Sequence, residues 1–283
     1  MTTETTSALT LQYEGSVKRV WQPPDSDELW FEFTDDYSVF DWGKMPNAIK
    51  GKGRALTIMG AWFFERLAEP KLWQSLAAND QLGHIDKEFL DTLCSTATFT
   101  ELKEAGLKHH FIALTDKDGN RLSIEQAATA EDTVFMAVKK AEVLRPQPAV
   151  LLNNTVFSYP DRTDYGARRL VPLEVVFRFG MPSGSSLKER LARDPSYAQL
   201  LGLRQAPSEG SFFERPVIEL YTKLEPKDRL LSVQEALLIS GLLPAQFARL
   251  AHTAQAMALG LFVLFAQRCI ELWAGKLECF LFR

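Results

Sequence analysis

The chain has 283 residues, of which 46% are apolar and 24% are charged, as is typical of a folded protein with one large or two modest domains. A formal net charge of −4 argues against a general nucleic-acid-binding surface, and the longest apolar run, residues 256–266, is shorter than the roughly 20 residues that span a bilayer. Residues 1–10 are predicted to be a flexible tail and not a signal peptide, so the sequence indicates a cytoplasmic protein without membrane or nucleic-acid partners.

The first predicted elements are two strands, residues 11–21 and 29–34, joined as a hairpin by the turn-forming segment 22–28. Leu29, Phe31 and Phe33 alternate along the second strand, so they are expected to share one buried face.

A dense acidic turn follows this strand. Its carboxylates, Asp35, Asp36 and Asp41, repel one another unless a metal, an arginine or a substrate amine joins them, and a solvated acidic loop is the alternative. The turn leads into a predicted helix over residues 54–67, with an apolar stripe formed by Leu56, Met59, Phe63 and Leu67.

Short helical pieces over residues 70–105 are predicted as an insertion into the first domain, which ends with a strand at 133–139. Residues 143–170 contain three prolines and are predicted as loop, before a strand at 173–179.

Capping boxes at Ser186–Glu189 and Ser232–Glu235 predict two helix starts, and a long final helix is expected over about 244–272. Because strands come early and helices late, the sequence predicts an α+β fold, with a β-rich domain over 11–142 and an α/β domain over 143–283.

Residues able to carry chemistry fall into four blocks. The first pairs Gly15 with Lys18, because a glycine in a strand lets a ligand approach and a nearby lysine can meet a phosphate. The chain has no P-loop sequence, and Gly51 and Gly53 lack the third glycine of a dinucleotide fingerprint, so an ATP site would be of another, sheet-covered kind.

The other three blocks lie in the second half, at residues 172–185, 219–229 and 270–278. They contain Glu174, Arg178, Ser185, Lys223, Asp228, Lys276 and Glu278. For Arg178, the alternative to phosphate binding is a strand arginine paired with Glu174 or another neighbour. For Lys223 and Asp228, the alternative is a solvated charged loop.

In order and spacing, these blocks resemble the SAICAR synthetase family over about residues 11–280. The family pattern Tyr-x-Glu-Gly-Lys-x-Lys-Arg is similar to residues 13–19, Phe-x-Asp-Asp to residues 33–36, and Pro-x-Glu-Val-x-x-Arg to residues 172–178. A family Lys-Gly element that enters a helix is similar to Lys52-Gly53.

The resemblance implies an antiparallel-sheet nucleotide domain, like those of kinases and ATP-grasp enzymes, followed by a mixed α/β domain. It also implies an ATP- and magnesium-dependent ligase of purine biosynthesis. That ligase joins carboxyaminoimidazole ribotide to L-aspartate through an acyl phosphate and releases SAICAR, ADP and phosphate.

The resemblance also implies residue roles. ATP would contact Gly15, Lys18 and Lys276, with Glu278 as the magnesium ligand. The ribotide would contact Glu174, Arg178 and Ser185. The implied catalytic residues are Lys18, Asp36, Lys52, Lys223 and Asp228.

Two departures from the family pattern leave the activity open. Ala274 stands where the family has aspartate, and the sequence ends at Arg283, before the family's acidic Asp-Glu, Ser-Pro-Asp and arginine elements, which leaves open whether the chain is truncated or has lost that part. Three readings follow: an active synthase, a catalytically impaired relative that binds nucleotide or ribotide, or a related amide-forming ligase with a different substrate. The sequence also leaves homo-oligomerisation open.

Overall fold

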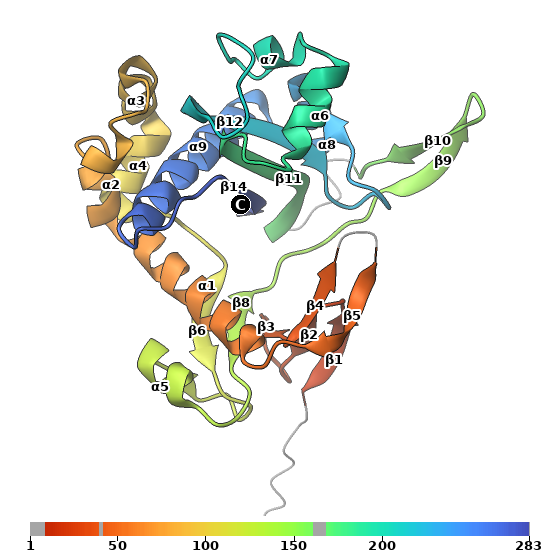
Figure 1. Ribbon diagram of the computed structural model, residues 1–283. Helices are drawn as coiled ribbons and strands as arrows, with labels where there is room; N and C mark the ends of the chain where they lie inside the picture. Colours follow the sequence, from red (N-terminus) through yellow and green to blue (C-terminus); the bar gives the residue numbers. More distant parts are fainter. Residues whose placement is uncertain (1–8, 40–41, 161–167, 283) are drawn as a thin grey trace, which may run out of the picture. The chain divides into compact units, whose positions relative to one another are not determined.

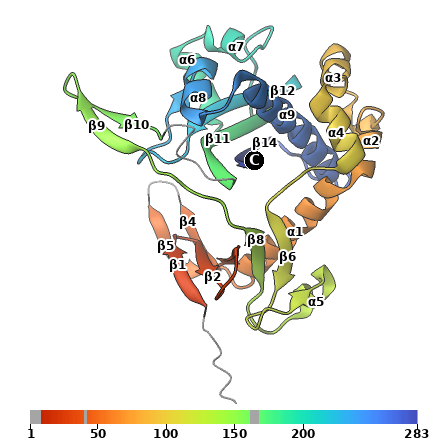
Figure 2. The same cartoon turned by 180° about the vertical axis from the view of Figure 1, so that it is seen from behind.

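The computed structural model describes residues 9–39, 42–160 and 168–282, so Asp41 and most of the predicted tail lie outside the described residues. The chain forms two compact units, one made of Met1–Ala68 with Leu107–Lys140 and the other of Glu69–Gly106 with Ala141–Arg283 (Figures 1 and 2). The helical segment that the sequence assigned to the first domain therefore groups with the second unit.

The first unit is built on a fully antiparallel sheet of six strands in the order β1-β2-β3-β8-β6-β7. The strands are β1 (Thr10–Glu14), β2 (Lys18–Gln22), β3 (Glu28–Phe33), β8 (Phe135–Lys139), β6 (Phe111–Thr115) and β7 (Arg121–Leu122). The expected hairpin is thus a three-stranded meander. Its first turn lies at Gly15, whose N–H donates to the carbonyl oxygen of Lys18 at 2.8 Å.

Alternation along β3 has the predicted effect. Leu29, Phe31 and Phe33 pack on the cluster beneath helix α1 (Lys52–Ala68), whereas Trp30 joins a second cluster on the other face of the sheet. A short helix, α5 (Ile124–Thr129), also contributes to the first cluster.

The predicted stripe of α1 is partly wrong. Met59 is exposed, while Gly53, Thr57 and Ala61 are buried with Leu67. Small residues occupy this face because the helix approaches the sheet closely: a Cβ on Gly53 would lie only 2.1 Å from the carbonyl oxygen of Phe33.

The predicted acidic turn is also partly wrong, because Asp36 begins a strand. β4 (Asp36–Val39) pairs with β5 (Gly43–Ala48) as a separate antiparallel hairpin of the first unit.

The second unit contains a four-stranded antiparallel sheet in the order β13-β12-β11-β14. The strands are β13 (Leu230–Leu231), β12 (Phe212–Thr222), β11 (Arg168–Gly180) and β14 (Ala274–Phe282). Pro172 lies inside β11, where pairing with β14 is interrupted between Leu170 and Glu174, as expected for a residue that cannot donate a backbone hydrogen bond.

Helices α8 (Val233–Ser240) and α9 (Pro244–Ala266) cover one face of this sheet, which is apolar: Leu173, Val175 and Leu220 pack with Leu250 and other helix residues. The remaining helices are α2 (Pro70–Leu76), the 3₁₀ turn Asp80–Leu82, α3 (Lys87–Cys94), α4 (Ala97–Ala105), α6 (Ser186–Arg193) and α7 (Tyr197–Leu200). The α+β class predicted from the sequence is confirmed.

The capping box at Ser232 and Glu235 is confirmed, and α9 ends at Ala266, earlier than predicted. Among the described helices, α9 alone has the length and apolar composition to cross a membrane, and 44% of its most apolar window is buried inside the protein. Core helices meet the same criteria, and Phe247, Leu250 and Ala254 of α9 contribute to the core under the sheet.

Residues 147–158, predicted as loop, form a hairpin of their own. β9 (Gln147–Leu151) pairs with β10 (Asn154–Ser158) around a two-residue turn. Leu152 and Asn153 both have positive φ, 49° and 61°, which defines a type I′ turn. The turn lacks the glycine that usually signals this type, so the pattern did not reveal it.

Candidate functional site

One face of the second unit's sheet carries four of the predicted site residues, Glu174, Arg178, Lys276 and Glu278. In the strand register Glu174 lies opposite Tyr221 and Glu278, and Val176 lies opposite Glu219 and Lys276. Opposed residues in antiparallel strands point to the same side, as do alternate residues along one strand. The charged face, as we call it, therefore consists of Glu174, Arg178, Glu219, Tyr221, Lys276 and Glu278.

At one end of the charged face, Arg178 is held by Glu219. Nε of Arg178 donates to the carboxylate at 2.5 Å, and Nη2 lies 3.4 Å from the hydroxyl of Ser186. The side chain of Glu219 is fully buried, and Arg178 is 13% exposed. Arg178 thus has a neighbouring carboxylate as partner, that of Glu219 and not that of Glu174, and the predicted phosphate contact stays a prediction.

Glu219 has two further partners. Arg190 of α6 lies 2.8 Å from its other carboxylate oxygen, and the hydroxyl of Tyr197 donates to the same oxygen at 2.7 Å. Burial and the hydrogen bond to Glu219 raise the pKa of Tyr197. A buried carboxylate is tolerable here because two guanidinium groups and a phenol satisfy it.

Ser185 serves a helix end in the structure. Its hydroxyl accepts a hydrogen bond from the N–H of Leu187 at 3.3 Å, which makes it the N-cap of α6. The predicted capping box, which placed Ser186 at the cap, is therefore wrong by one residue. Ser186 is instead the hydroxyl next to Arg178.

At the other end of the charged face, lysines and carboxylates interleave around Glu174. Lys276 Nζ lies 3.1 Å from its carboxylate and Lys223 Nζ lies 3.7 Å away. Lys223 is also paired with Glu278 at 2.8 Å. Glu174 is almost completely buried, whereas the side chain of Glu278 is half exposed.

The charges of this cluster shift its pKa values. Burial lowers the pKa of Lys223, but the hydrogen bond and charge of Glu278, with the charges of Glu174 and Asp228, outweigh it and raise the pKa overall. Burial and the nearby Glu174 raise the pKa of Asp228, against the opposing effects of Lys223 and Lys276. Asp228 thus belongs electrostatically to the same cluster, and its carboxylate is more basic than usual.

In the first unit, Gly15 closes the β1–β2 turn and Lys18 follows it on β2. The ammonium of Lys18 lies 4.2 Å from the centre of the Phe31 ring, a cation–π contact. A Cβ on Gly15 would meet the ring of Tyr13 at 3.2 Å, so the turn is tightly packed on one side.

Asp35 and Asp36, which follow β3, both have partners within the chain. Asp35 accepts hydrogen bonds from the N–H groups of Gly53 and Gly51, both at 2.9 Å, at the start of α1. These bonds, that of Gly53 first, lower the pKa of Asp35. Asp36 forms an ion pair with Lys44 at 2.8 Å, and this contact lowers its pKa.

Lys52 points back to the same strand end. Its ammonium donates to the carbonyl oxygens of Asp36 at 2.7 Å and Thr34 at 3.1 Å. Lys52 and Asp36 are therefore neighbours through the backbone of Asp36.

The described residues contain no group of three histidine, cysteine, aspartate or glutamate side chains that could hold a metal ion. Glu278 is paired with Lys223, and two lysines separate the carboxylates of the cluster. Such a donor set fits a magnesium ion only where nucleotide phosphates supply further oxygens, as is common for Mg²⁺.

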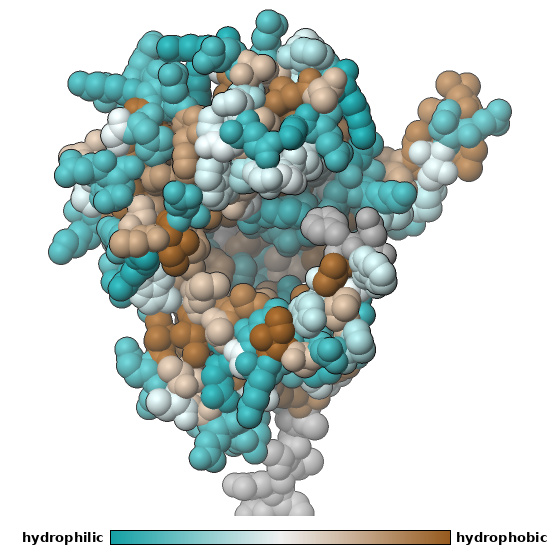
Figure 3. All heavy atoms as spheres, in the orientation of Figure 1, coloured by the Kyte–Doolittle hydropathy of each residue, from teal (hydrophilic) through white to brown (hydrophobic). Residues whose placement is uncertain are grey.

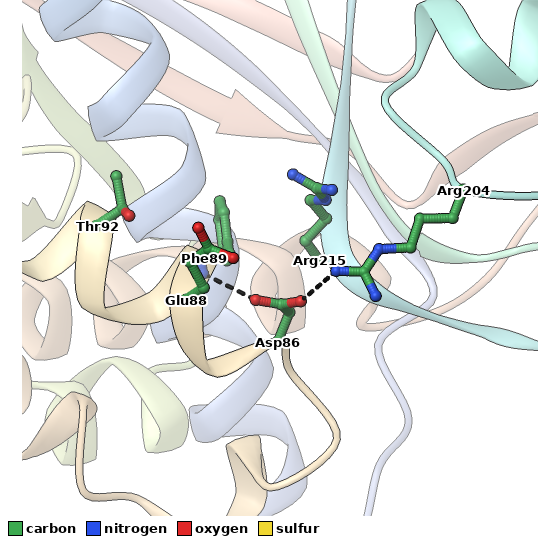
Figure 4. A pocket seen from close by; sticks show the side chains of 6 residues that line it. All are labelled: Asp86, Glu88, Phe89, Thr92, Arg204 and Arg215. Carbon is green, nitrogen blue, oxygen red and sulfur yellow. Dashed lines mark hydrogen bonds and ion pairs between the residues drawn. The ribbon is translucent and has the colours of Figure 1, made fainter.

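A pocket of about 320 Å³ in the second unit contains none of the predicted site residues (Figure 4). Asp86, the N-cap of α3, accepts from the N–H of Phe89 at 2.9 Å and pairs with Arg204 at 3.2 Å across it. The pocket is lined by Asp86, Glu88, Phe89, Thr92, Arg204 and Arg215.

Sequence reasoning missed Glu219, Arg190, Tyr197 and Lys44. For Glu219 a signal was present, because it stands between Ile218 and Leu220 in an apolar strand, where a charged residue is buried only with partners. For the other three, nothing local indicated a role.

Comparison with known proteins identifies the family of the chain. The sequence profile described as SAICAR synthetase matches residues 11–84 and 76–282. A relative from Archaeoglobus fulgidus, provisionally named a phosphoribosylaminoimidazole-succinocarboxamide synthase, is 31% identical over 78% of this chain and 52% of its own length. A synthase of the same name from Thermoplasma acidophilum is 28% identical over 85% of this chain and 58% of its own. The chain thus spans about half the length of the curated relatives it matches.

Solved structures share the fold. The phosphoribosylaminoimidazole-succinocarboxamide synthase of Ehrlichia chaffeensis superimposes with a TM-score of 0.55 at 17% identity, covering 95% of this chain and 74% of that one. A SAICAR synthetase in complex with ADP superimposes with a TM-score of 0.54 at 22% identity. The match covers 95% of this chain and 78% of that one. On the strength of the profile match and the relatives, the chain belongs to the SAICAR synthetase family.

Proposed function

We propose that the chain condenses carboxyaminoimidazole ribotide with L-aspartate, using ATP. The observation that carries the proposal is the charged face, where Arg178 is fixed by a buried carboxylate and a lysine–carboxylate cluster follows on the same sheet. Family membership supports the reaction class, and the ADP complex of a structural neighbour supports nucleotide binding.

The reaction has two balanced steps. An oxygen of the ribotide carboxylate attacks the γ-phosphorus of ATP, and the bond to the bridging oxygen breaks to release ADP. The aspartate amine then attacks the acyl carbon, loses a proton, and expels inorganic phosphate as the amide forms.

We assign Arg178 to the ribotide phosphate. Pairing of Nε with Glu219 orients the guanidinium plane, and planar guanidinium groups recognise phosphate oxygens through parallel hydrogen bonds. Ser185, at the start of α6, and Glu174 are proposed as further ribotide contacts.

We assign Lys223 a purely electrostatic role. Its raised pKa keeps it protonated at neutral pH, so it serves to neutralise developing charge and not to take a proton. The raised pKa of Asp228 suits the opposite task, because a more basic carboxylate better accepts the proton that the amine loses.

Gly15, Lys18 and Lys276 are proposed nucleotide contacts, and Glu278 the carboxylate for a magnesium ion that arrives with the phosphates. When bound, the ion supplies charge neutralisation of phosphate oxygens. Asp36 and Lys52 are proposed to shape the strand end beside α1.

A second candidate function rests on Ala274. It lies opposite Arg178 in the strand register, at the position where the family pattern has aspartate. Loss of that carboxylate from the charged face favours the alternative that this chain is a relative that binds nucleotide or ribotide but turns over slowly.

The test is to incubate the purified chain with ATP, L-aspartate and the ribotide, and to measure SAICAR and ADP by mass spectrometry. Equal amounts of both products support the proposal. Binding of ADP and ribotide without product supports the second candidate, and ATP hydrolysis only with another acid or amine supports a ligase of different specificity.

The role of Arg178 is tested with Arg178→Lys, which keeps the charge but loses the planar fork. We expect the KM for ribotide to rise about 10- to 100-fold, the worth of a charged hydrogen bond. Arg193→Lys is the control, since that α6 side chain is 81% exposed. If both substitutions change the KM for ribotide equally, Arg178 does not contact the ribotide phosphate.

A further inference from the structure

The β9–β10 hairpin carries large apolar side chains that are exposed to solvent. Val150 is 79% exposed, Leu151 60% and Leu152 86%, and β9 and β10 pair with none of the other described strands. Figures 1 and 2 show the hairpin standing away from the sheet and helices of its own unit, and Figure 3 shows brown, apolar atoms at its tip.

The base of the hairpin is anchored. Pro146 is buried, and the hydroxyl of Tyr159 donates to the carboxylate of Glu225 at 2.7 Å. An isolated two-stranded hairpin is marginally stable in water, so this element is one that gains from a partner strand.

The two outer edges of the hairpin differ. Leu151 and Asn154 flank the type I′ turn and form the first hydrogen-bonded pair, so hydrogen-bonded and non-hydrogen-bonded pairs then alternate down the register. Two pairs are non-hydrogen-bonded, so their backbone polar groups point away from the partner strand of the hairpin. These pairs are Val150 with Thr155 and Pro148 with Phe157.

Pro148 has no N–H, so the edge of β9 lacks a donor at that position. The edge of β10 keeps both outward N–H groups, those of Thr155 and Phe157. The β10 edge is therefore the one competent to accept another strand.

We propose that β10 pairs with β10 of a second copy of this chain, antiparallel about a two-fold axis at Val156. In that register Thr155 of one copy faces Phe157 of the other, and their outward N–H and C=O groups form hydrogen-bonded pairs on both sides of the axis. The two Val156 side chains meet at the axis as a non-hydrogen-bonded pair.

Charge favours a second copy as the occupant. Residues 146–160 contain no aspartate, glutamate, lysine or arginine, so two identical edges meet without like-charge repulsion. The same stretch offers a charged partner nothing to recognise.

Paired proline substitutions test the edge. Thr155→Pro and Val150→Pro remove outward N–H groups from directly opposite residues, so any loss of hairpin stability is matched. Light scattering over rising protein concentration should show a dimer for the wild type and Val150→Pro, and a monomer for Thr155→Pro. A monomeric wild type, or the same result for both variants, overturns the proposal.

A disulfide tests the register independently. In the proposed dimer the Cα atoms at Val156 are about 4.5 Å apart, within disulfide range. Those at Ala149, opposite Val156 within the hairpin, are separated by three strand spacings, about 14 Å.

Under mild oxidation most Val156→Cys protein should become a covalent dimer, while Ala149→Cys should match the wild type with its three native cysteines. If Val156→Cys does not cross-link faster than Ala149→Cys, this pairing is ruled out. It is also ruled out if the cysteine at position 156 cross-links to a different protein in place of a second copy.

Discussion

Arg178 and Glu219 lie on neighbouring strands, diagonal to each other in the register, and are joined by a 2.5 Å hydrogen bond between Nε and a carboxylate oxygen. The carboxylate is fully buried and also meets Arg190. Two cationic side chains therefore depend on one acidic residue, whose only local signal is its position between Ile218 and Leu220 in an apolar strand.

Glu219→Gln should lower the free energy of unfolding by about 3–5 kcal/mol, because two guanidinium groups lose their buried counter-charge. Urea denaturation measures the change. Glu209→Gln is the control, since Glu209 pairs with Lys188 at the surface, where solvent screens the pair, and its loss should cost far less than that of Glu219. Similar losses would contradict the central role of Glu219.

Gly53→Ala should destabilise the first unit by about 1–3 kcal/mol, because the new Cβ collides with the backbone of Phe33. Gly60→Ala in the same helix is the matched control. There the Cβ would meet only the terminal methyl of Met136, which can move, so stability should stay within about 1 kcal/mol of the wild type. Thermal unfolding of both variants decides the point.

Asp35→Asn should weaken the N-terminus of α1 by about 1 kcal/mol at most, because solvent screens this site. The pKa of Asp35 is lowered in the folded state, so its stabilising effect is present above the unfolded pKa of about 3.9 and disappears as pH falls through the folded value. The difference in free energy of unfolding between wild type and variant should therefore disappear below about pH 4. A constant gap from pH 7 to pH 3 would contradict this origin.

Asp228→Asn should raise stability at neutral pH while reducing ligase activity. The folded-state pKa of Asp228 is raised, so its ionised form opposes folding above the folded pKa, and this penalty is absent below the unfolded value of about 3.9. Thermal unfolding should give the variant a higher melting temperature than the wild type at pH 7 and the same melting temperature in acid. Lower stability at pH 7 would contradict the electrostatic assignment.

The sequence by itself determined what depends on neighbours along the chain. The sequence showed the alternation that places Leu29, Phe31 and Phe33 on one partly buried face, the capping box at Ser232, and the ordered motifs that identified the family. These features are local because strand and helix periodicity place nearby residues on one face.

Only the tertiary structure decided which distant residues meet. It paired Arg178 with Glu219, capped α1 with Asp35, turned Lys52 to the backbone of Asp36, and made small residues the buried face of α1. Each outcome depends on strand register or on how closely a helix approaches a sheet, and these follow from packing of the whole unit.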